Sequence, residues 1–226
     1  MMSFQRAHSP EQREERRRVI LDTASSMLDE MPVAEITLNE LSRRVGLAKS
    51  NVLRYFESRE AILLELATAA LADFNAQAES ALATIDPAAS VFERGEQVAS
   101  ALTDCLAANP VLCELVSTQA SVLERNISTE AVLRYKRDSI RNFEALAASI
   151  LRRLPELGEE GVAKFGAAAM LMTGAIWTHA HPAAAILAAY EADPALAIYK
   201  LDFTPALRET LQVLIAGLLA RKTSPA

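Results

Sequence analysis

The sequence predicts an all-α fold, and three observations support that prediction. Apolar residues recur at helical spacing along nearly the whole chain of 226 residues. No stretch shows the two-residue alternation that is typical of a half-buried strand. Helix starts are marked by a capping residue followed by proline, or by a capping box. These starts are Ser9-Pro10 with Gln12, Thr37 with Glu40, Asp86-Pro87, Asn109-Pro110 and Thr204-Pro205.

These marks divide the chain into about nine helices. Alanine-rich stretches at residues 67–89 and 183–197 favour helix over disorder. The expected helices span residues 10–30, 38–45, 49–55, 59–83, 87–108, 110–125, 128–154, 159–180 and 205–221.

Composition excludes several classes of protein. Hydrophobic residues make up 51% of the chain, which suffices for a buried core that needs no disulfide bond or structural metal. The two cysteines, Cys105 and Cys113, stand outside any CxxC or Cys/His cluster, so we expect buried, reduced thiols. The first residues contain no signal-like apolar segment, and the longest apolar run, GAAAMLMTGAIW, is too short to cross a bilayer. We therefore expect a soluble, cytoplasmic protein with no membrane partner.

Residues 38–57 have the spacing of a helix-turn-helix. With Leu38 as the first position, Gly46 falls at the turn, where it can adopt a left-handed conformation at little cost. Small Ser42 falls where the two helices cross. The fourth, eighth, tenth, fifteenth and eighteenth positions, which point inward in such a motif, are Leu41, Val45, Leu47, Val52 and Tyr55.

The outward face of the second helix is polar and cationic, and its side chains suit a DNA major groove. Although the chain carries a net charge of −6, residues 41–59 hold five cations and one anion, a local charge of +4. The alternative is a plain corner between two amphipathic helices with a solvated face. The groove-facing set is Lys49, Ser50, Asn51 and Arg54, and Thr37 and Arg59 lie at flanking helix starts that suit phosphates.

The segment ITLNELSRRVGLAKSNVLRYFESREAILLEL resembles the DNA-binding segment of TetR-type transcriptional regulators. The resemblance covers residues from about 12 to 66. Three positions depart from the family pattern: Ala48 replaces a capping serine, Leu53 a tyrosine and Arg59 a lysine. By resemblance, the positions that contact DNA are Thr37, Lys49, Ser50, Asn51, Arg54, Tyr55 and Arg59.

The resemblance implies two domains and a dimer. We expect a three-helix helix-turn-helix DNA-binding domain at residues 9–58 and a larger helical ligand-binding and dimerisation domain at residues 59–226. A homodimer would place two recognition helices on double-stranded DNA and so favour a palindromic operator. Two apolar stripes are core or subunit interface: Val162, Phe165, Ala169, Met172 and Ile176, and then Leu207, Leu211, Leu214, Ile215, Leu218 and Leu219.

Aromatic and polar residues in the larger part suggest a cavity for a small-molecule effector. The candidates are Tyr135, Phe143, Trp177 and His179. The alternative is that Trp177 caps the core and the histidines mark a helix end. His179 and His181 lie two residues apart and point in divergent directions on a helix, so we expect no metal, and nothing indicates a cofactor.

The expected function is a bacterial transcriptional repressor that a small apolar or aromatic ligand releases from its operator. An enzyme is not expected, because the chain lacks GxSxG, HExxH, Walker and dinucleotide-binding motifs. The departures at Ala48 and Leu53 leave a second hypothesis, a helical interaction module that has lost specific DNA binding.

Overall fold

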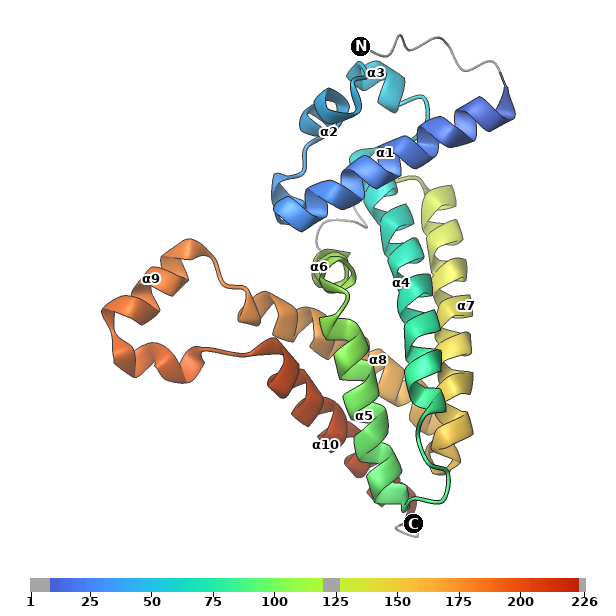
Figure 1. Ribbon diagram of the computed structural model, residues 1–226, viewed down its shortest axis with the longest axis vertical. Coiled ribbons are helices and arrows are strands. Elements are labelled where there is room, and N and C mark those ends of the chain that lie inside the picture. Colours follow the sequence, from blue (N-terminus) through green and yellow to red (C-terminus); the bar gives the residue numbers. More distant parts are fainter. Residues whose placement is uncertain (1–8, 120–126, 224–226) are drawn as a thin grey trace. The chain divides into compact units, whose positions relative to one another are not determined.

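The computed structural model describes residues 9–119 and 127–223, and every regular element in these ranges is a helix (Figure 1). The predicted all-α fold class is thereby confirmed. Among the described residues no single helix is long and apolar enough to span a membrane; α5 and α6 qualify only jointly, and they are bent by 90°. The elements are α1 (Pro10–Glu30), η1 (Val33–Glu35), α2 (Leu38–Val45), α3 (Lys49–Val52), α4 (Arg59–Ala83), α5 (Val91–Ala107), α6 (Pro110–Thr118), α7 (Thr129–Arg153), η3 (Pro155–Leu157), α8 (Gly158–Ala180), α9 (Ala184–Ala192), η4 (Pro194–Tyr199) and α10 (Phe203–Thr223).

The start of α5 differs from the prediction. The helix begins at Val91 rather than at residue 87, because Ser90 and Glu93 form a complete capping box. The Asp86 carboxylate instead accepts the backbone N–H of Ala88 at 2.8 Å, which closes a turn before the helix. The aspartate–proline pair therefore marks a turn rather than a helix start.

Two other helices differ from expectation, and the predicted end of a third is not described. α3 ends at Val52 rather than at residue 55, because the next backbone bonds close tighter turns, such as Arg54 N–H to the Asn51 carbonyl at 3.2 Å. α6 is described as far as Thr118, and residues 120–125 of the predicted helix lie outside the described part. α9 is an additional helix, in a stretch whose alanine content favours helix.

The chain forms two compact units. The first is Met1–Thr68 with Thr118–Lys136, of which residues 9–68, 118–119 and 127–136 are described. The second is Ala69–Ser117 with Arg137–Ala226, described as far as residue 223. Helices α4 and α7 each contribute to both units. A functional boundary between residues 58 and 59 stays a prediction.

Arg17 ties three segments of the first unit together. Its Nη1 donates to the backbone carbonyl of Tyr55 at 2.6 Å, and its Nη2 donates to both carboxylate oxygens of Glu65 at 2.8 and 2.6 Å. The guanidinium also lies 4.3 Å from the centroid of the Phe56 ring. The planar Arg17 guanidinium, with its several bonds, fixes α1 to the residues that follow α3 and to the start of α4.

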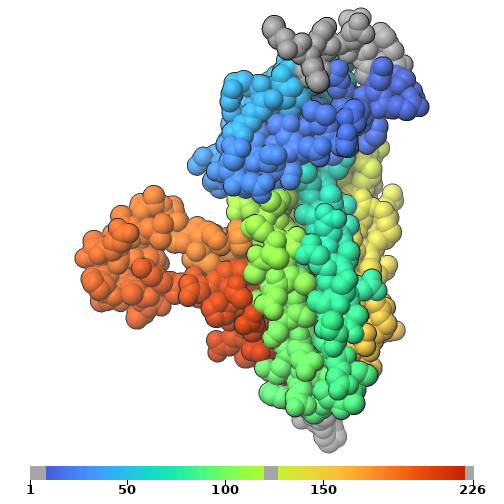
Figure 2. Space-filling model, viewed as in Figure 1, coloured from blue at the N-terminus to red at the C-terminus, as the bar shows by residue number. Residues whose placement is uncertain are grey.

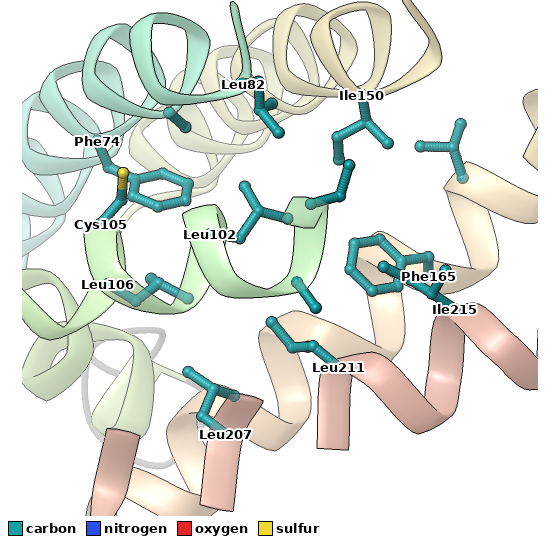
Figure 3. Packing of buried hydrophobic residues seen from close by; sticks show 14 of the residues in the cluster. Phe74, Leu82, Leu102, Cys105, Leu106, Ile150, Phe165, Leu207, Leu211 and Ile215 are labelled. Atoms are coloured by element: carbon teal, nitrogen blue, oxygen red, sulfur yellow. The ribbon is translucent and has the colours of Figure 1, made fainter. Parts of the chain in front are cut away.

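The second unit has one continuous apolar core, to which α4, α5, α6, α7, α8 and α10 contribute (Figure 3). Most of the two apolar stripes predicted from sequence lie inside this core. The buried members belong to the core, because a residue buried within its own chain is not available to a partner, and an interface made by the remaining members stays a prediction. The buried members are Val162, Phe165, Ile176, Leu207, Leu211 and Ile215.

Replacing Gly46 with alanine should destabilise the protein, whereas the same change at Gly217 should stabilise it. Gly46 has φ 74°, and a left-handed conformation costs a residue with a Cβ roughly 1–2 kcal/mol. Gly217 lies inside α10, and an added Cβ there meets no atom within 4 Å, so alanine should contribute about 0.5–1 kcal/mol. Urea unfolding followed by circular dichroism measures both changes. Equal shifts of the same sign would contradict this account of the turn.

Both cysteines should be unreactive in the folded protein. Burial raises the pKa of Cys113 to about 12 and also raises the pKa of Cys105, so little reactive thiolate forms near neutral pH. We expect a thiol reagent at pH 8 to modify neither cysteine in the native protein and both after unfolding. Rapid modification of the native protein would show that this part of the core opens readily.

Candidate nucleic-acid interface

The turn between α2 and α3 is held by a backbone motif that requires Gly46. The Gly46 N–H donates to the Arg43 carbonyl at 3.2 Å, and the Leu47 N–H donates to the Ser42 carbonyl at 3.0 Å. Together with the left-handed Gly46, these bonds satisfy the last carbonyls of α2. Ser42 is buried, and its hydroxyl donates to the Leu38 carbonyl at 2.6 Å, so no polar atom is stranded there.

The apolar positions of the motif face inward as the sequence predicts. Because they fix the rotation of both helices, the remaining side chains of α3 must face outward. Leu41, Val45 and Val52 are buried, and Leu47 and Tyr55 are partly buried.

The side chains predicted to enter a groove lie together on the exposed side of α3. Lys49, Ser50, Asn51 and Arg54 are all exposed, and no described residue forms a hydrogen bond or ion pair with their side chains. They combine positive charge with an amide and a hydroxyl. This is a set of groups that pairs with base edges and phosphates.

The flanking predicted residues have different surroundings. Thr37 is exposed, and its hydroxyl oxygen accepts the Glu40 backbone N–H at 3.1 Å, which leaves the hydroxyl hydrogen for a phosphate. Tyr55 is partly buried. Arg59 is 19% exposed, and its Nε lies 3.5 Å from a Glu60 carboxylate oxygen. A phosphate contact from Arg59 would therefore have to come from its outer nitrogens.

Arg43 and Arg44 are paired within the protein, with carboxylates that lie outside the cationic segment 41–59. Arg43 donates to Glu40 at 2.8 and 2.6 Å, and Arg44 donates to Glu40 at 3.0 Å and to Glu30 at 2.7 Å. Hydrogen bonds from Arg43 and then Arg44 lower the pKa of Glu40 to about 2, so this carboxylate stays charged well below neutral pH. Among the described residues, Lys49 on α3 and Arg54 just after it have no such carboxylate partner.

Ala48 confirms one expected weakness of the motif. It forms no side-chain cap at the start of α3, where a serine would accept a backbone N–H. Leu53, the second departure, is 41% exposed and presents an apolar surface beside the polar set. The recognition segment therefore relies on its packed side, rather than on a cap, for its conformation.

The predicted ligand residues that belong to the second unit do not come together in one place. Tyr135 belongs to the first unit, and the others belong to the second. Phe143 packs on Gly166, where an added Cβ would lie 2.1 Å from its ring. Gly166 precedes Trp177 by about 16 Å along α8, so Phe143 and Trp177 do not share a contact site. His179 is exposed.

Trp177 has other partners than those proposed from sequence. Its indole N–H donates to Glu114 at 3.0 Å, its ring centroid lies 3.9 Å from that of His181, and Phe203 meets it edge-on at 5.0 Å. His181, rather than His179, is therefore the histidine beside the tryptophan. Helix α8 ends at Ala180, and His181 is its C-cap residue. The chain turns there, which places the His181 ring next to Trp177.

Sequence reasoning also missed Arg17. The available signal was its place at the same helical spacing as Ile20 and Ala24, which puts an arginine on the buried face of α1. Such an arginine needs a carboxylate or carbonyl partner. The neighbouring residues carry charges of both signs, so the buried position of Arg17 did not stand out from the exposed ones.

Comparisons with known proteins agree with this geometry. A family model described as bacterial regulatory proteins, tetR family, matches residues 20–66, and one described as tetracyclin repressor-like, C-terminal domain, matches residues 65–222. The HTH-type transcriptional regulator EthR of Mycobacterium tuberculosis is 36% identical over 53 residues, which is 24% of this chain and 24% of that protein. The chain thus matches about a quarter of the length of these curated relatives.

Solved structures show the same fold over nearly the whole chain. A TetR transcriptional regulator from Rhodococcus sp. RHA1 has a TM-score of 0.54 at 14% identity, covering 93% of this chain and 98% of that one. The fatty acid degradation regulator FadR from Bacillus halodurans has a TM-score of 0.53 at 18% identity, covering 94% and 98%. Because the second family model alone covers more than half of the sequence, the chain belongs to the TetR family of bacterial regulatory proteins.

Proposed function

We propose that this protein is a cytoplasmic transcriptional repressor that binds a palindromic DNA operator as a homodimer and is released by a small apolar or aromatic ligand. The observation that carries the proposal is the exposed set Lys49, Ser50, Asn51 and Arg54 on a helix held by the Gly46 turn. These side chains have no other partner among the described residues. Membership of a family of regulatory proteins supports the same conclusion.

Direct recognition of bases is assigned to Asn51 and Arg54. Asparagine pairs with adenine through two hydrogen bonds, and arginine pairs with guanine in the same way. Lys49 and Thr37 contribute phosphate contacts that position the helix but carry no sequence information. Because the chain is acidic overall, attraction of DNA depends on local cations such as those of this face, which makes binding sensitive to salt.

A homodimer is supported by apolar side chains that remain exposed on the helices of the second unit. Met170, Leu171 and Met172 on α8 are exposed, as is Val213 on α10. Exposed apolar surface of this kind marks a protein interface. A twofold dimer presents two recognition helices to DNA, so the operator should have two half-sites separated by about one helical turn or a multiple of it.

The ligand response is assigned to the surroundings of Trp177. The indole with His181 and Phe203 offers aromatic surface, and Glu114 offers a hydrogen-bond acceptor. A ligand lowers the affinity for DNA if it binds more tightly to a conformer whose two recognition helices are wrongly spaced for the operator. The loss of DNA affinity is set by the difference between the ligand's affinities for the two conformers. Helix α4 contributes to both units and is therefore the natural route of coupling.

The Arg54→Ala variant should bind operator DNA about 10- to 100-fold more weakly, because one two-bond base contact contributes roughly 1–3 kcal/mol. Fluorescence anisotropy against the operator measures the dissociation constant. Arg152→Ala is the matched control, since it removes an exposed arginine from the second unit. If both variants bind as tightly as the wild type, Arg54 does not contact the operator.

A ligand that releases the operator should change the fluorescence of Trp177, which is the only tryptophan in the chain. Binding beside the indole alters its contacts and its solvent exposure, so we expect a shift or quenching that saturates with ligand. The Trp177→Phe variant should lose the signal and bind the ligand more weakly. Release of DNA with unchanged emission would place the effector site elsewhere.

A further inference from the structure

The segment 184–201, here called the arm, is ordered but has no buried residue. It contains α9 and η4, which pack on each other, and Asp193 caps η4 by accepting the Ala195 N–H at 3.0 Å. Figures 1 and 2 show the arm, in orange, standing away from α8 and α10 of the same unit. Its large apolar side chains are exposed: Ile186, Leu187, Ile198, Tyr199 and Leu201.

The composition of the arm is that of a segment that packs against something. Its sequence AAILAAYEADPALAIYKL contains three charged residues, whereas disordered segments have low hydrophobicity and high charge. Ordering such a segment costs backbone entropy, and burial of apolar surface is the term that offsets that cost. Ile198 is 82% exposed and Tyr199 is 64% exposed, so the chain itself does not supply the burial.

The same chain carries further exposed apolar residues on α8 and α10, the two helices that flank the arm. Met170, Leu171 and Met172 on α8 and Val213 on α10 are exposed, and we call these four residues the acceptor face. The arm connects the end of α8 to the start of α10. The end of α8, where the arm begins, lies about 12 Å along the helix from Met172 and about 15 Å from Met170. Both the arm and the acceptor face stay uncovered within one chain.

The exposed area favours a second copy as the occupant. The nine exposed apolar side chains of the arm and the acceptor face are between 36% and 82% exposed, and together they present on the order of 800 Å² of surface. This is about the area per partner that a standard interface buries. A twofold dimer also pairs arm with acceptor face twice, in equal numbers, and leaves neither surface open.

We propose that the arm of each subunit crosses to a second copy of this chain and packs its Ile198 and Tyr199 side on the partner's acceptor face. The inference rests on the homodimer of the proposed function and deepens it, because it assigns the arm as the segment that closes the dimer. The acidic residues Glu191 and Asp193 then remain at the rim, in solvent, as charges at an interface should.

Cross-linking between two differently substituted chains tests this exchange. Full-length Ile198→Cys, carrying a size tag, is mixed with full-length Leu171→Cys and treated with a short bismaleimide. Native Cys105 and Cys113 are buried, so they contribute little background. We expect a covalent heterodimer from the mixture. An Ile140→Cys chain mixed with Leu171→Cys is the control, because Ile140 is exposed on α7 outside both surfaces.

Product no greater than in the control would overturn the arm exchange. Sedimentation separates this outcome from failure of the dimer itself. Ile198→Asp should raise the dimer dissociation constant at least about 100-fold, since each dimer loses two buried isoleucines, whereas Ile140→Asp should leave it unchanged. A monomeric wild type would refute both the homodimer and the exchange. A wild-type dimer without the cross-link would refute the exchange alone.

Discussion

The left-handed turn at Gly46 decides which residues of the first unit face solvent. A residue with a Cβ would resist φ 74°, and without that conformation the bonds to the Arg43 and Ser42 carbonyls would not close. The turn brings the short α3 across α2 at one angle, and buried Val52 then fixes its rotation. The polar face follows from this packing, because every position not used for the core is directed outward. The chemistry of the interface is thus a consequence of backbone geometry.

Charge pairing refines what that interface offers to DNA. A count of charges along the segment suggests a broad cationic patch, but Arg43 and Arg44 are bonded to carboxylates on α1 and α2. Such paired arginines keep their charge, yet a phosphate must compete with the carboxylates for their hydrogen bonds. Lys49 and Arg54 have no such competitor among the described residues. Under the proposed function, DNA recognition therefore depends mainly on the exposed residues of α3 and on Arg54, which follows it.

The sequence predicted most elements because capping and periodicity act locally. The turn at Gly46 and the inward apolar positions could be read directly, as each depends on neighbours within about ten residues. Tertiary contacts could not be read in the same way. The partner of Trp177 is His181 rather than His179 because the helix ends there and the chain turns back. Likewise a stripe of leucines has the same spacing whether its own chain or a second chain covers it, and only the fold shows that Leu211 is covered from within.

The most direct test of the account is the binding of the full chain to the DNA that flanks its own gene, measured by fluorescence anisotropy at two salt concentrations with random DNA as competitor. The account predicts tight binding that survives the competitor and weakens steeply with salt, because a few exposed cations on α3 replace counterions on phosphates. Binding no tighter than that of random DNA would contradict the claim that the exposed face of α3 reads a specific operator in this DNA.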